Sequence, residues 1–431
     1  MSSVLGVPLP AAWSVAPLKH VSSRLNRGSA PNYVDEGPVR AISQATNQAG
    51  GLDWSRTRFH NFSGDPTRLK GYLRPDDVLI NSTGTGTLGR IGYFSKSPDG
   101  LPCMADSHVT VARAKPDELD ARFSYYWLGS RPFQEYVYAA LVVGATNQIE
   151  LNRDRLGDAP IPLPPLKEQR RIADFLDAET ARIDRMAAKR SRMQGLLQLK
   201  RERFIESTLG LERESKHHSL VPLKYLVADV TVGIVITPAK WYVESGGTPA
   251  LRGTNVKPGS IDASELVHIS AAGDTENAKS RLKTGDVVVV RTGQAGAAAV
   301  VPSDLDGSNC IDLIIVRPGM RVDPEYLEYV LNSDYSRARV SEHSVGSIQA
   351  HFNVGAMKEI PIPSLPVSEQ KQIVTRLRTE VGSLDLLKQK LARQNTLLAE
   401  RRQALITAAV TGQFDVSTAS GRNVTDGVPT S

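Results

Sequence analysis

Cysteine is almost absent from this sequence. The 431 residues include two, Cys103 and Cys310, which are far apart and belong to no CxxC pair. Two isolated thiols cannot form the disulfide framework of a secreted domain, and they do not match the spacing of a zinc ligand set. Such sparse cysteine is typical of a reducing compartment, so we expect a cytoplasmic protein.

Long apolar runs are also missing. No stretch approaches the roughly 18 apolar residues of a membrane span, and the first residues lack the basic segment of a signal peptide. Apolar residues make up 40% and charged residues 23% of the chain, which excludes disordered and collagen-like classes. At 431 residues the chain is long enough for two globular domains. Its net charge of +6 permits an acidic partner such as nucleic acid without requiring one.

Recognisable catalytic motifs are missing as well. The sequence has no HExxH and no GxSxG motif. The glycine-rich segment TGTGTLGRIG at residues 83–92 lacks the GxxxxGK[ST] frame of a phosphate-binding loop. His217 and His218 are adjacent in a charged linker, where solvated side chains are commoner than metal ligands. We therefore predict no catalytic residue, no metal site and no cofactor bound by this chain.

What the sequence does contain is an internal repeat. The segment PIPLPPLKEQRRIADFLDAETARID at residues 160–184 returns as PIPSLPVSEQKQIVTRLRTEVGSLD at residues 361–385, 201 positions further on. Upstream, YLRPDDVLINSTG at residues 72–84 matches RLKTGDVVVVRTG at residues 281–293, with an offset of 209. Small insertions account for the change in offset, so the chain is a tandem duplication.

Each copy of the proline-rich strip opens a long helix. Apolar residues then recur at alternating steps of four and three, the spacing of paired helices. The helices should run from about residue 166 to 210 and from about 367 to 412, on the order of 65 Å each. One such helix lying on its own domain is the alternative, but two in the same register favour pairing with each other. The expected pairing residues are Ile172, Leu176, Ile183, Leu197, Phe204, Ile373, Leu377, Leu384, Leu398 and Leu405.

The connectivity predicts how these parts are arranged. If the second helix packs on the first, it returns antiparallel and places the domains at opposite ends of a rod, a dumbbell with a pseudo-twofold axis. Within the domains, DVLI, HVTVAR, DVVVV and DLIIVR are typical of short strands, which predicts an α+β (mixed α/β) fold. We expect a first domain at residues 1–165, a long helix and linker at 166–216, a second domain at 217–366, a second long helix at 367–415 and a disordered tail at 416–431.

Cations at matched positions indicate a DNA interface. Lys70 and Arg74 reappear as Lys279 and Lys283, immediately before the DVLI and DVVVV strands. Shared charge beside diverging loops is expected of phosphate contacts, and solvated lysines at a strand entrance are the alternative. The loops that follow are candidates for base reading, because Arg pairs well with guanine and Gln with adenine, and ordinary turn residues are the alternative there. The predicted DNA-binding residues are Lys70, Arg74, Thr85, Thr87, Arg90, Lys279, Lys283, Arg291, Thr292 and Gln294.

The motifs together resemble a known family. The doubled PIP…EQ strip, the helices that close in LKRERFIESTLG and ERRQALITAAVTG, and LRGTNVKPGSID before GDVVVVRTG are similar to the specificity subunits of type I restriction-modification systems. The resemblance extends from about residue 17 to 416. It implies that each domain is a target recognition domain reading one half of a bipartite asymmetric DNA site. It also implies that the helices set the spacer and dock two methyltransferase subunits.

The resemblance further implies that the chain has no activity of its own. It would be the non-catalytic subunit of a site-specific adenine methyltransferase and ATP-dependent endodeoxyribonuclease. The implied partners are double-stranded DNA, two methyltransferase subunits and restriction subunits, which would bind S-adenosylmethionine, ATP and Mg. Two other classes stay open on the residues alone: a two-lobed protein-binding scaffold that dimerises through its coiled coil, and an enzyme with a dispersed site.

Overall fold

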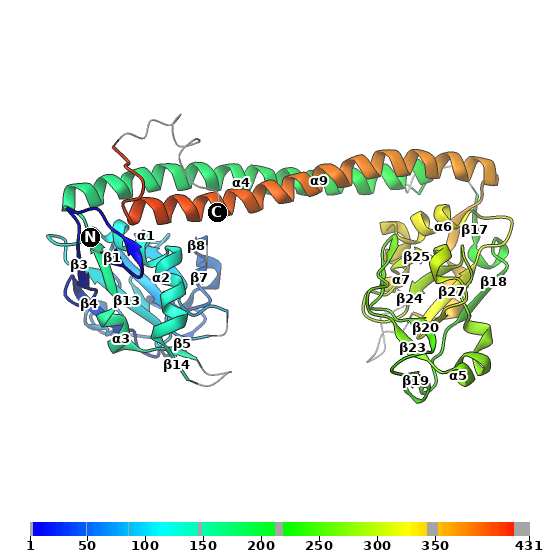
Figure 1. Ribbon diagram of the computed structural model, residues 1–431, viewed down its shortest axis with the longest axis horizontal. Helices are drawn as coiled ribbons and strands as arrows, with labels where there is room; N and C mark the ends of the chain where they lie inside the picture. Colours follow the sequence, from blue (N-terminus) through cyan, green and yellow to red (C-terminus); the bar gives the residue numbers. More distant parts are fainter. Residues whose placement is uncertain are drawn as a thin grey trace. The chain divides into compact units, whose positions relative to one another are not determined.

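The chain folds into two compact units. The computed structural model describes residues 3–48, 50–84, 86–144, 149–211, 219–342 and 352–417. The first unit consists of residues 1–189 with 394–431, and the second of residues 190–393. Each unit therefore contains one globular domain and one half of each long helix (Figure 1). Within the described ranges, no helix is both long and apolar enough to cross a membrane.

The first domain is built around an antiparallel sheet of order β11-β10-β13-β4. Its middle strands are buried, as expected for runs of β-branched residues that pack on both faces. Helix α1 packs on this sheet and buries Phe123 and Trp127. These elements are β4 (Ser22–Arg27), β10 (Asp77–Asn81), β11 (Ile91–Phe94), β13 (Val109–Ala114), α1 (Ala121–Leu128) and α2 (Arg131–Tyr136).

A second sheet of order β12-β6-β9-β5 completes this domain, and its β12–β6 pair is parallel. Its strands are β5 (Tyr33–Val34), β6 (Val39–Ile42), β9 (Arg58–His60) and β12 (Cys103–Ala105). The smaller elements are β1 (Ser3–Val4), β2 (Val7–Pro8), β7 (Asn47–Gln48), β8 (Gly51–Leu52), β14 (Val142–Val143), β15 (Glu150–Leu151) and α3 (Arg153–Asp158).

The second domain repeats the two four-stranded sheets of the first. Its sheets have the orders β25-β24-β27-β18 and β26-β20-β23-β19, again with one parallel pair. The strands are β18 (Asp229–Val232), β19 (Tyr242–Val243), β20 (Thr248–Leu251), β23 (Val267–Ile269), β24 (Val287–Val290), β25 (Ala298–Val300), β26 (Asn309–Cys310) and β27 (Leu313–Arg317). The remaining elements are β21 (Val256–Lys257), β22 (Ser260–Ile261), α5 (Ala271–Glu276), α6 (Pro324–Leu331), α7 (Asp334–Glu342) and α8 (Val354–Glu359).

Each domain is joined to its own long helix by a two-stranded ribbon and a buried glutamine. The Gln169 side chain accepts a hydrogen bond from the backbone N–H of Asp120 at 2.8 Å and donates to two backbone carbonyls. Gln370 makes the same three bonds, with the N–H of Asp323 at 2.7 Å. The ribbons pair β16 (Pro160–Leu163) with β3 (Ser14–Pro17) and β28 (Pro361–Pro363) with β17 (Leu220–Pro222).

The long helices are α4 (Leu166–Leu209) and α9 (Val367–Val410), of 44 residues each. Both begin just after the proline-rich strip, since proline is suited to a helix start. Both end before a glycine with a positive φ, 67° at Gly210 and 71° at Gly412. Glycine adopts this left-handed conformation without the steric penalty that a Cβ would bring, which explains where the helices stop.

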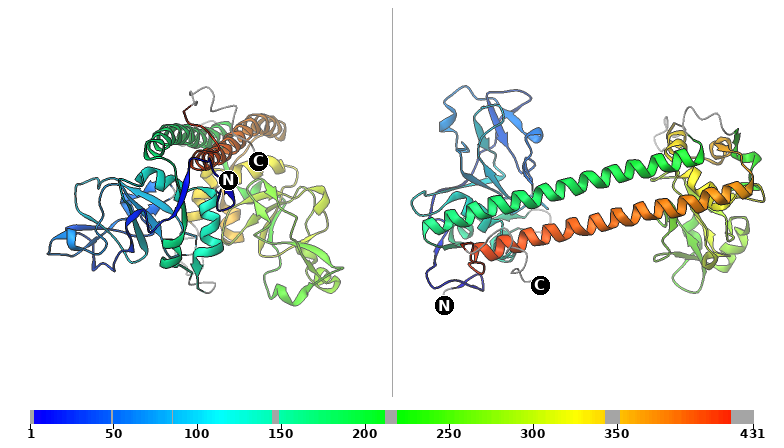
Figure 2. Two further views of the ribbon diagram at one scale, coloured as in Figure 1. Left: turned by 60° about the vertical axis from the view of Figure 1, so that its left-hand side comes forward. Right: turned by 90° about the horizontal axis from the view of Figure 1, so that it is seen from above.

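Within each unit the two helix halves run antiparallel and lie side by side (Figures 1 and 2). In the second unit, Arg201 pairs with Asp385 at 3.1 Å, and Gln198, which is nearer the start of α4, bonds to the later residue Lys388. In the first unit, Asp184 pairs with Arg402 at 3.2 Å. The two ion pairs are repeat copies, because each of their members lies 201 positions from its counterpart.

The ends of the helices pack into the domain cores. Of the expected pairing residues, Ile172, Leu176, Ile183 and Leu405 are buried in the core of the first unit, with Leu398 packed against it. Leu377 is buried in the core of the second unit, with Phe204 and Ile373 against it, and Leu197 and Leu384 are half-buried. The expected pairing residues near the helix ends thus pack in or against the domain cores, whereas Leu197 and Leu384, nearer the middle, are half-buried. Their pairing across the two helices stays a prediction.

The last turns of each helix also bond to the domain on which they end. Thr407 Oγ1 of α9 accepts the N–H of Arg131, the first residue of α2, at 3.4 Å. Glu206 of α4 accepts the N–H of Tyr335 in α7 at 3.1 Å. Since positions 206 and 407 are repeat partners, the end of α4 serves the second domain as the end of α9 serves the first.

The predicted mixed α/β class, with two tandem domains and two long helices in antiparallel contact, is confirmed. The four strand-like segments are β10, β13, β24 and β27. Of the expected tail, Val416 is buried in the core of the first unit, and residues 418–431 lie outside the described residues. His217 and His218 also lie outside them.

We expect Gln169→Ala and Gln370→Ala each to lower the free energy of unfolding by about 2–4 kcal/mol. Each substitution leaves one buried backbone N–H and two backbone carbonyls without their hydrogen-bond partner. Urea unfolding measures this. The matched control is Gln372→Ala, on an exposed position of α9, with an expected change below about 0.5 kcal/mol. An effect at positions 169 and 370 no larger than the control would show that the glutamine joints are dispensable.

Candidate nucleic-acid interface

A buried aspartate stands at the entrance of the strand that follows the predicted cations: Asp77 is the first residue of β10, and Asp286 directly precedes β24. Asp77 accepts the backbone N–H of Arg74 at 2.7 Å and forms two bonds of 2.7 Å with the Arg113 guanidinium. In the second domain, Asp286 accepts the N–H of Lys283 at 2.9 Å. The aspartate holds the backbone at the strand entrance, which leaves the side chains of Arg74 and Lys283 exposed there.

The four predicted phosphate contacts are accessible. Lys70, Arg74, Lys279 and Lys283 are all exposed, and none of them forms a salt bridge with the described part of the chain. A cation without a carboxylate partner keeps its full charge available to a phosphate. The four side chains are therefore accessible, and their contact with phosphates stays a prediction.

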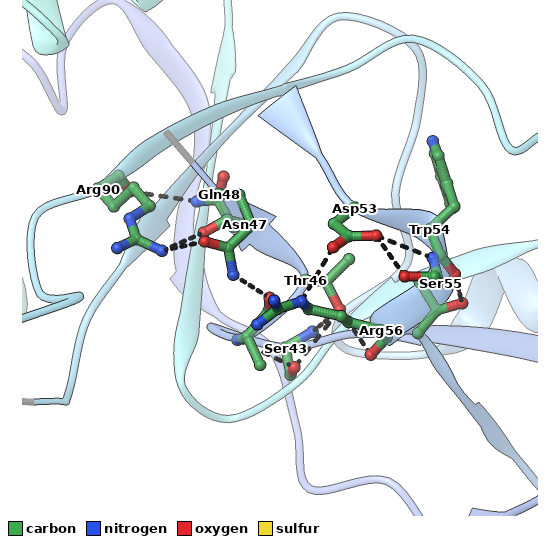
Figure 3. Close-up of polar contacts among 11 residues, drawn as sticks. Ser43, Thr46, Asn47, Gln48, Asp53, Trp54, Ser55, Arg56 and Arg90 are labelled. Atoms are coloured by element: carbon green, nitrogen blue, oxygen red, sulfur yellow. Dashed lines mark hydrogen bonds and ion pairs between the residues drawn. The ribbon is translucent and has the colours of Figure 1, made fainter. Parts of the chain in front are cut away.

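The loop between β10 and β11 is largely occupied with its own domain. Thr87 Oγ1 donates to the carbonyl of Thr83 at 3.1 Å. The Arg90 guanidinium donates to Gln48 Oε1 at 2.9 Å and to the Asn47 carbonyl at 3.2 Å, so it reaches into the β7–β8 hairpin (Figure 3). Thr85 lies outside the described residues. Arg90 can read a base only by giving up or sharing these bonds.

The corresponding loop of the second domain contains an internal ion pair. Arg291 bonds to Asp312 at 2.7 Å, and its side chain is 18% exposed. Thr292 donates to the other oxygen of Asp312 at 3.2 Å. Gln294 is exposed in the turn that follows. Of the three predicted residues in this loop, Gln294 therefore has the most accessible side chain.

The structure adds a position that sequence reasoning passed over. Thr83 Oγ1 lies 2.8 Å from Nδ1 of His108, the residue before β13. Its counterpart Thr292 bonds to Asp312, the residue before β27. A shared threonine thus meets histidine in one domain and aspartate in the other. The sequence contains a signal for this difference, because HVTVAR and DLIIVR align and differ in their first residue. By their composition, however, the two segments predict only strands.

A small hairpin beside this loop is fixed by a buried amide. Asn47 donates from Nδ2 to Asn81 Oδ1 at 3.0 Å and to the Arg90 carbonyl at 3.2 Å (Figure 3). The strand next to it carries Gly92, where a Cβ would come within 2.2 Å of Asn47 Oδ1. Glycine is therefore required for the hairpin to approach β11. In the second domain Asn255 holds its own hairpin, donating to the Asp262 carbonyl at 3.0 Å.

The other end of this hairpin segment is an aspartate-capped turn that also repeats. Asp53 accepts the N–H of Ser55 at 3.1 Å (Figure 3), and Asp262 accepts that of Ser264 at 3.0 Å. Hydrogen bonds from the two serines lower the pKa of both aspartates. Both domains thus share the frame that supports the loops and differ in the residues displayed on it.

Cations and loop residues lie at opposite ends of one strand. Lys70 and Arg74 precede β10, whereas Arg90 and His108 belong to the segments at its far end. A five-residue strand is about 16 Å long, or about five base-pair steps of duplex DNA. If both predicted sets bind DNA, they would therefore form separate contact areas.

The two cysteines and the potential metal ligands are the further candidates for reactive groups. Burial raises the pKa of the Cys103 thiol to about 12 and also raises that of Cys310, so neither is a ready nucleophile. No group of three or more potential metal-ligating side chains occurs among the residues that the structure describes.

The fold and the candidate interface define a class: a duplicated two-domain protein in which two antiparallel helices connect similar domains with different loops. The profile of a known family, the type I restriction modification DNA specificity domain, matches residues 40–192 and 244–393. The two matches cover most of each domain and the start of each long helix. The chain belongs to this family.

The sequences of curated relatives align with nearly the whole chain. The specificity subunit of the type I restriction enzyme EcoKI, from Escherichia coli strain K12, is 22% identical over 94% of this chain and 90% of its own. That of EcoBI, from Escherichia coli, is 22% identical over 87% of this chain and 85% of its own.

Solved structures show the same fold. A chain from a structure described as the basis of complex assembly and conformational transition of the type I R-M system has a TM-score of 0.74 and 19% identity, with coverage of 94% of this chain and all (100%) of that chain. The HsdS subunit of Thermoanaerobacter tengcongensis has a TM-score of 0.52 and 19% identity over 95% of this chain and 99% of its own.

We expect Lys70→Ala and Lys279→Ala to weaken binding to all DNA duplexes alike. A plot of log affinity against log salt falls as salt rises, and each substitution should make this fall less steep. The slope should become less negative by about 0.9, the value for one lost phosphate contact. Fluorescence anisotropy over a salt series, with the assembled complex, measures both effects. The controls are Lys19→Ala and Lys224→Ala, whose side chains are paired with Asp158 and Glu359. A slope equal to that of the controls would remove both lysines from the interface.

Proposed function

We propose that this chain is the subunit that selects the DNA sequence for a type I restriction-modification complex, with each domain reading one half of a bipartite asymmetric site. The observation that carries the proposal is that the two domains share the residues that support the loops and differ in the residues that the loops display. The aspartate at the strand entrance, the exposed cations beside it and the threonine at the far end recur in both domains. The threonine's partner is His108 in one and Asp312 in the other.

This pattern is expected of two readers that contact equivalent phosphates and different bases. Phosphate contacts position a protein on the duplex and carry no sequence information, so they are free to stay the same. Base contacts depend on donors and acceptors, and an aspartate accepts where a neutral histidine both accepts and donates. We infer that His108, Asp312 and the exposed Gln294 take part in discriminating the two half-sites.

The helices supply the second part of the proposal. Each is 44 residues long and connects the two domains, so it is suited to set the spacer between the half-sites. Both also expose apolar side chains outside the pair, among them Leu196 at 58% and its repeat partner Leu397 at 53%. Exposed leucines on a soluble helix favour a protein partner, and two methyltransferase subunits fit a surface that occurs twice.

The partners would bring the chemistry. S-adenosylmethionine would be bound by the methyltransferase subunits, and ATP and Mg by restriction subunits, in the cytoplasm where DNA is accessible. A two-lobed protein scaffold is the second candidate. The same exposed leucines are compatible with it, but it leaves the repeated unpaired cations without a role.

We expect the purified chain to transfer no methyl group, and adenine methylation to appear when the cognate methyltransferase subunit is added. Incorporation of labelled methyl groups from S-adenosylmethionine into duplex DNA measures this. Methyl transfer by the isolated chain would contradict the proposal, as would methylation by the partner alone at the same sites.

Replacing residues 217–366 with the equivalent domain of a relative should change one half of the methylated sequence and leave the other half and the spacer intact. The physical reason is that each domain has its own sheets, loops and cations. Methylome sequencing of a host that carries the variant measures the outcome, with the parent chain as the reference. A replacement that altered both halves would show that the domains do not read independently.

A further inference from the structure

The two units differ in charge at one matched contact between a domain and its own long helix. The buried glutamine joints establish the correspondence, because they make identical bonds in both units. Two residues after the aspartate at each joint stand Arg122 on α1 and Glu325 on α6. Eight residues after each glutamine stand Asp177 on α4 and Arg378 on α9. The signs are opposite at both positions.

In the first unit the domain presents the cation. The Arg122 guanidinium lies 2.8 Å from a carboxylate oxygen of Asp174 and 2.8 Å from one of Asp177. Tyr126 donates to the other oxygen of Asp177 at 2.6 Å. Burial alone would lower the pKa of Arg122, but the hydrogen bonds to the two carboxylates outweigh burial and raise it. The arginine is therefore held between α1 and α4.

In the second unit the domain presents the anion. Glu325 forms an ion pair with Arg378, and the hydrogen bond that Arg378 donates to this carboxylate raises the pKa of the guanidinium. Thr375 replaces the aspartate found at position 174 of the first helix. At the neighbouring repeat position both helices have a cation, Arg170 and Lys371, so it does not distinguish the units.

We propose that this contact assigns each domain to its place: the first helix accepts a domain with a cation at this position, and the second helix accepts one with an anion. Moving the second domain onto the first helix would bring Glu325 against Asp174 and Asp177. The reverse move would bring Arg122 against Arg378. The glutamine joints are the same in both units and therefore do not distinguish the domains, whereas the charges at this contact do.

Arg122 and Glu325 are positioning residues in this view and have no part in reading DNA. Partly exposed ion pairs contribute modestly one at a time, and like charges at the same distance destabilise by a similar amount. Reversing one member of the contact should lower the melting temperature by about 2–6 °C. Because stability is measured without DNA, the proposal stands or falls independently of the proposed function.

The first test reverses the contact within the full chain. We expect Arg122→Glu to lower the melting temperature, and the triple variant with Asp174→Thr and Asp177→Arg to recover most of the loss, since it reproduces the contact of the second unit. The matched control is Arg131→Glu, whose ion pair with Glu135 stays within α2. The same two helix changes should restore nothing to this control. Equal recovery in both backgrounds, or none in either, would overturn the proposal.

The second test moves a domain. Residues 17–165 are replaced by a second copy of residues 222–366, joined at the matched PLK and PIP segments. This chimera should melt several degrees below the same chimera whose inserted copy carries Glu325→Arg. In the parent chain Glu325→Arg should have the opposite effect and destabilise, which separates a local gain from a general one. If the substitution changed both proteins in the same direction, the contact would not assign the domains.

Discussion

The structure depends on two antiparallel helices, each of which starts from one domain and ends on the other. The last turns of α4 place Ile205 and Leu209 in the core of the second unit, and those of α9 place Leu405 and Ile406 in the core of the first. The first core therefore contains side chains that lie far from its domain in the chain, whereas the second core contains the end of the helix that leads directly into its domain. Cutting either helix would leave both an exposed seam and an incomplete core.

The contacts that hold the helices and domains together are repeated in the two units. Each contact has one copy in each unit. The copies are Asp184–Arg402 and Arg201–Asp385 between the helices, the joints of Gln169 and Gln370, and the helix-end contacts of Thr407 and Glu206. They hold the helices and domains in one register, where a change costs packing in two places. The loops at the far ends of β10 and β24 do not hold the helices and domains together. The neighbouring residues His108 and Asp312 are therefore free to differ.

Charge behaves differently at the two kinds of contact. Between the helices, aspartate and arginine keep their places in both copies. Between domain and helix the signs reverse as a set, from Arg122 with Asp177 to Glu325 with Arg378. A pair that reverses together keeps its attraction, whereas a single reversal creates repulsion. Compensated reversal therefore preserves the fold and distinguishes the two halves.

The duplication, the two long helices, the central strands and the family can be predicted from the sequence, because these features depend on periodicity and on local motifs. The contacts of individual side chains depend on the tertiary structure. Arg90 and Arg291 have the chemistry of base readers, yet each is bonded to its own domain by partners from other segments. His108 looked like the first residue of a strand until the fold brought Thr83 beside it. Hydrogen bonds between segments many residues apart depend on three-dimensional register, which no local pattern encodes.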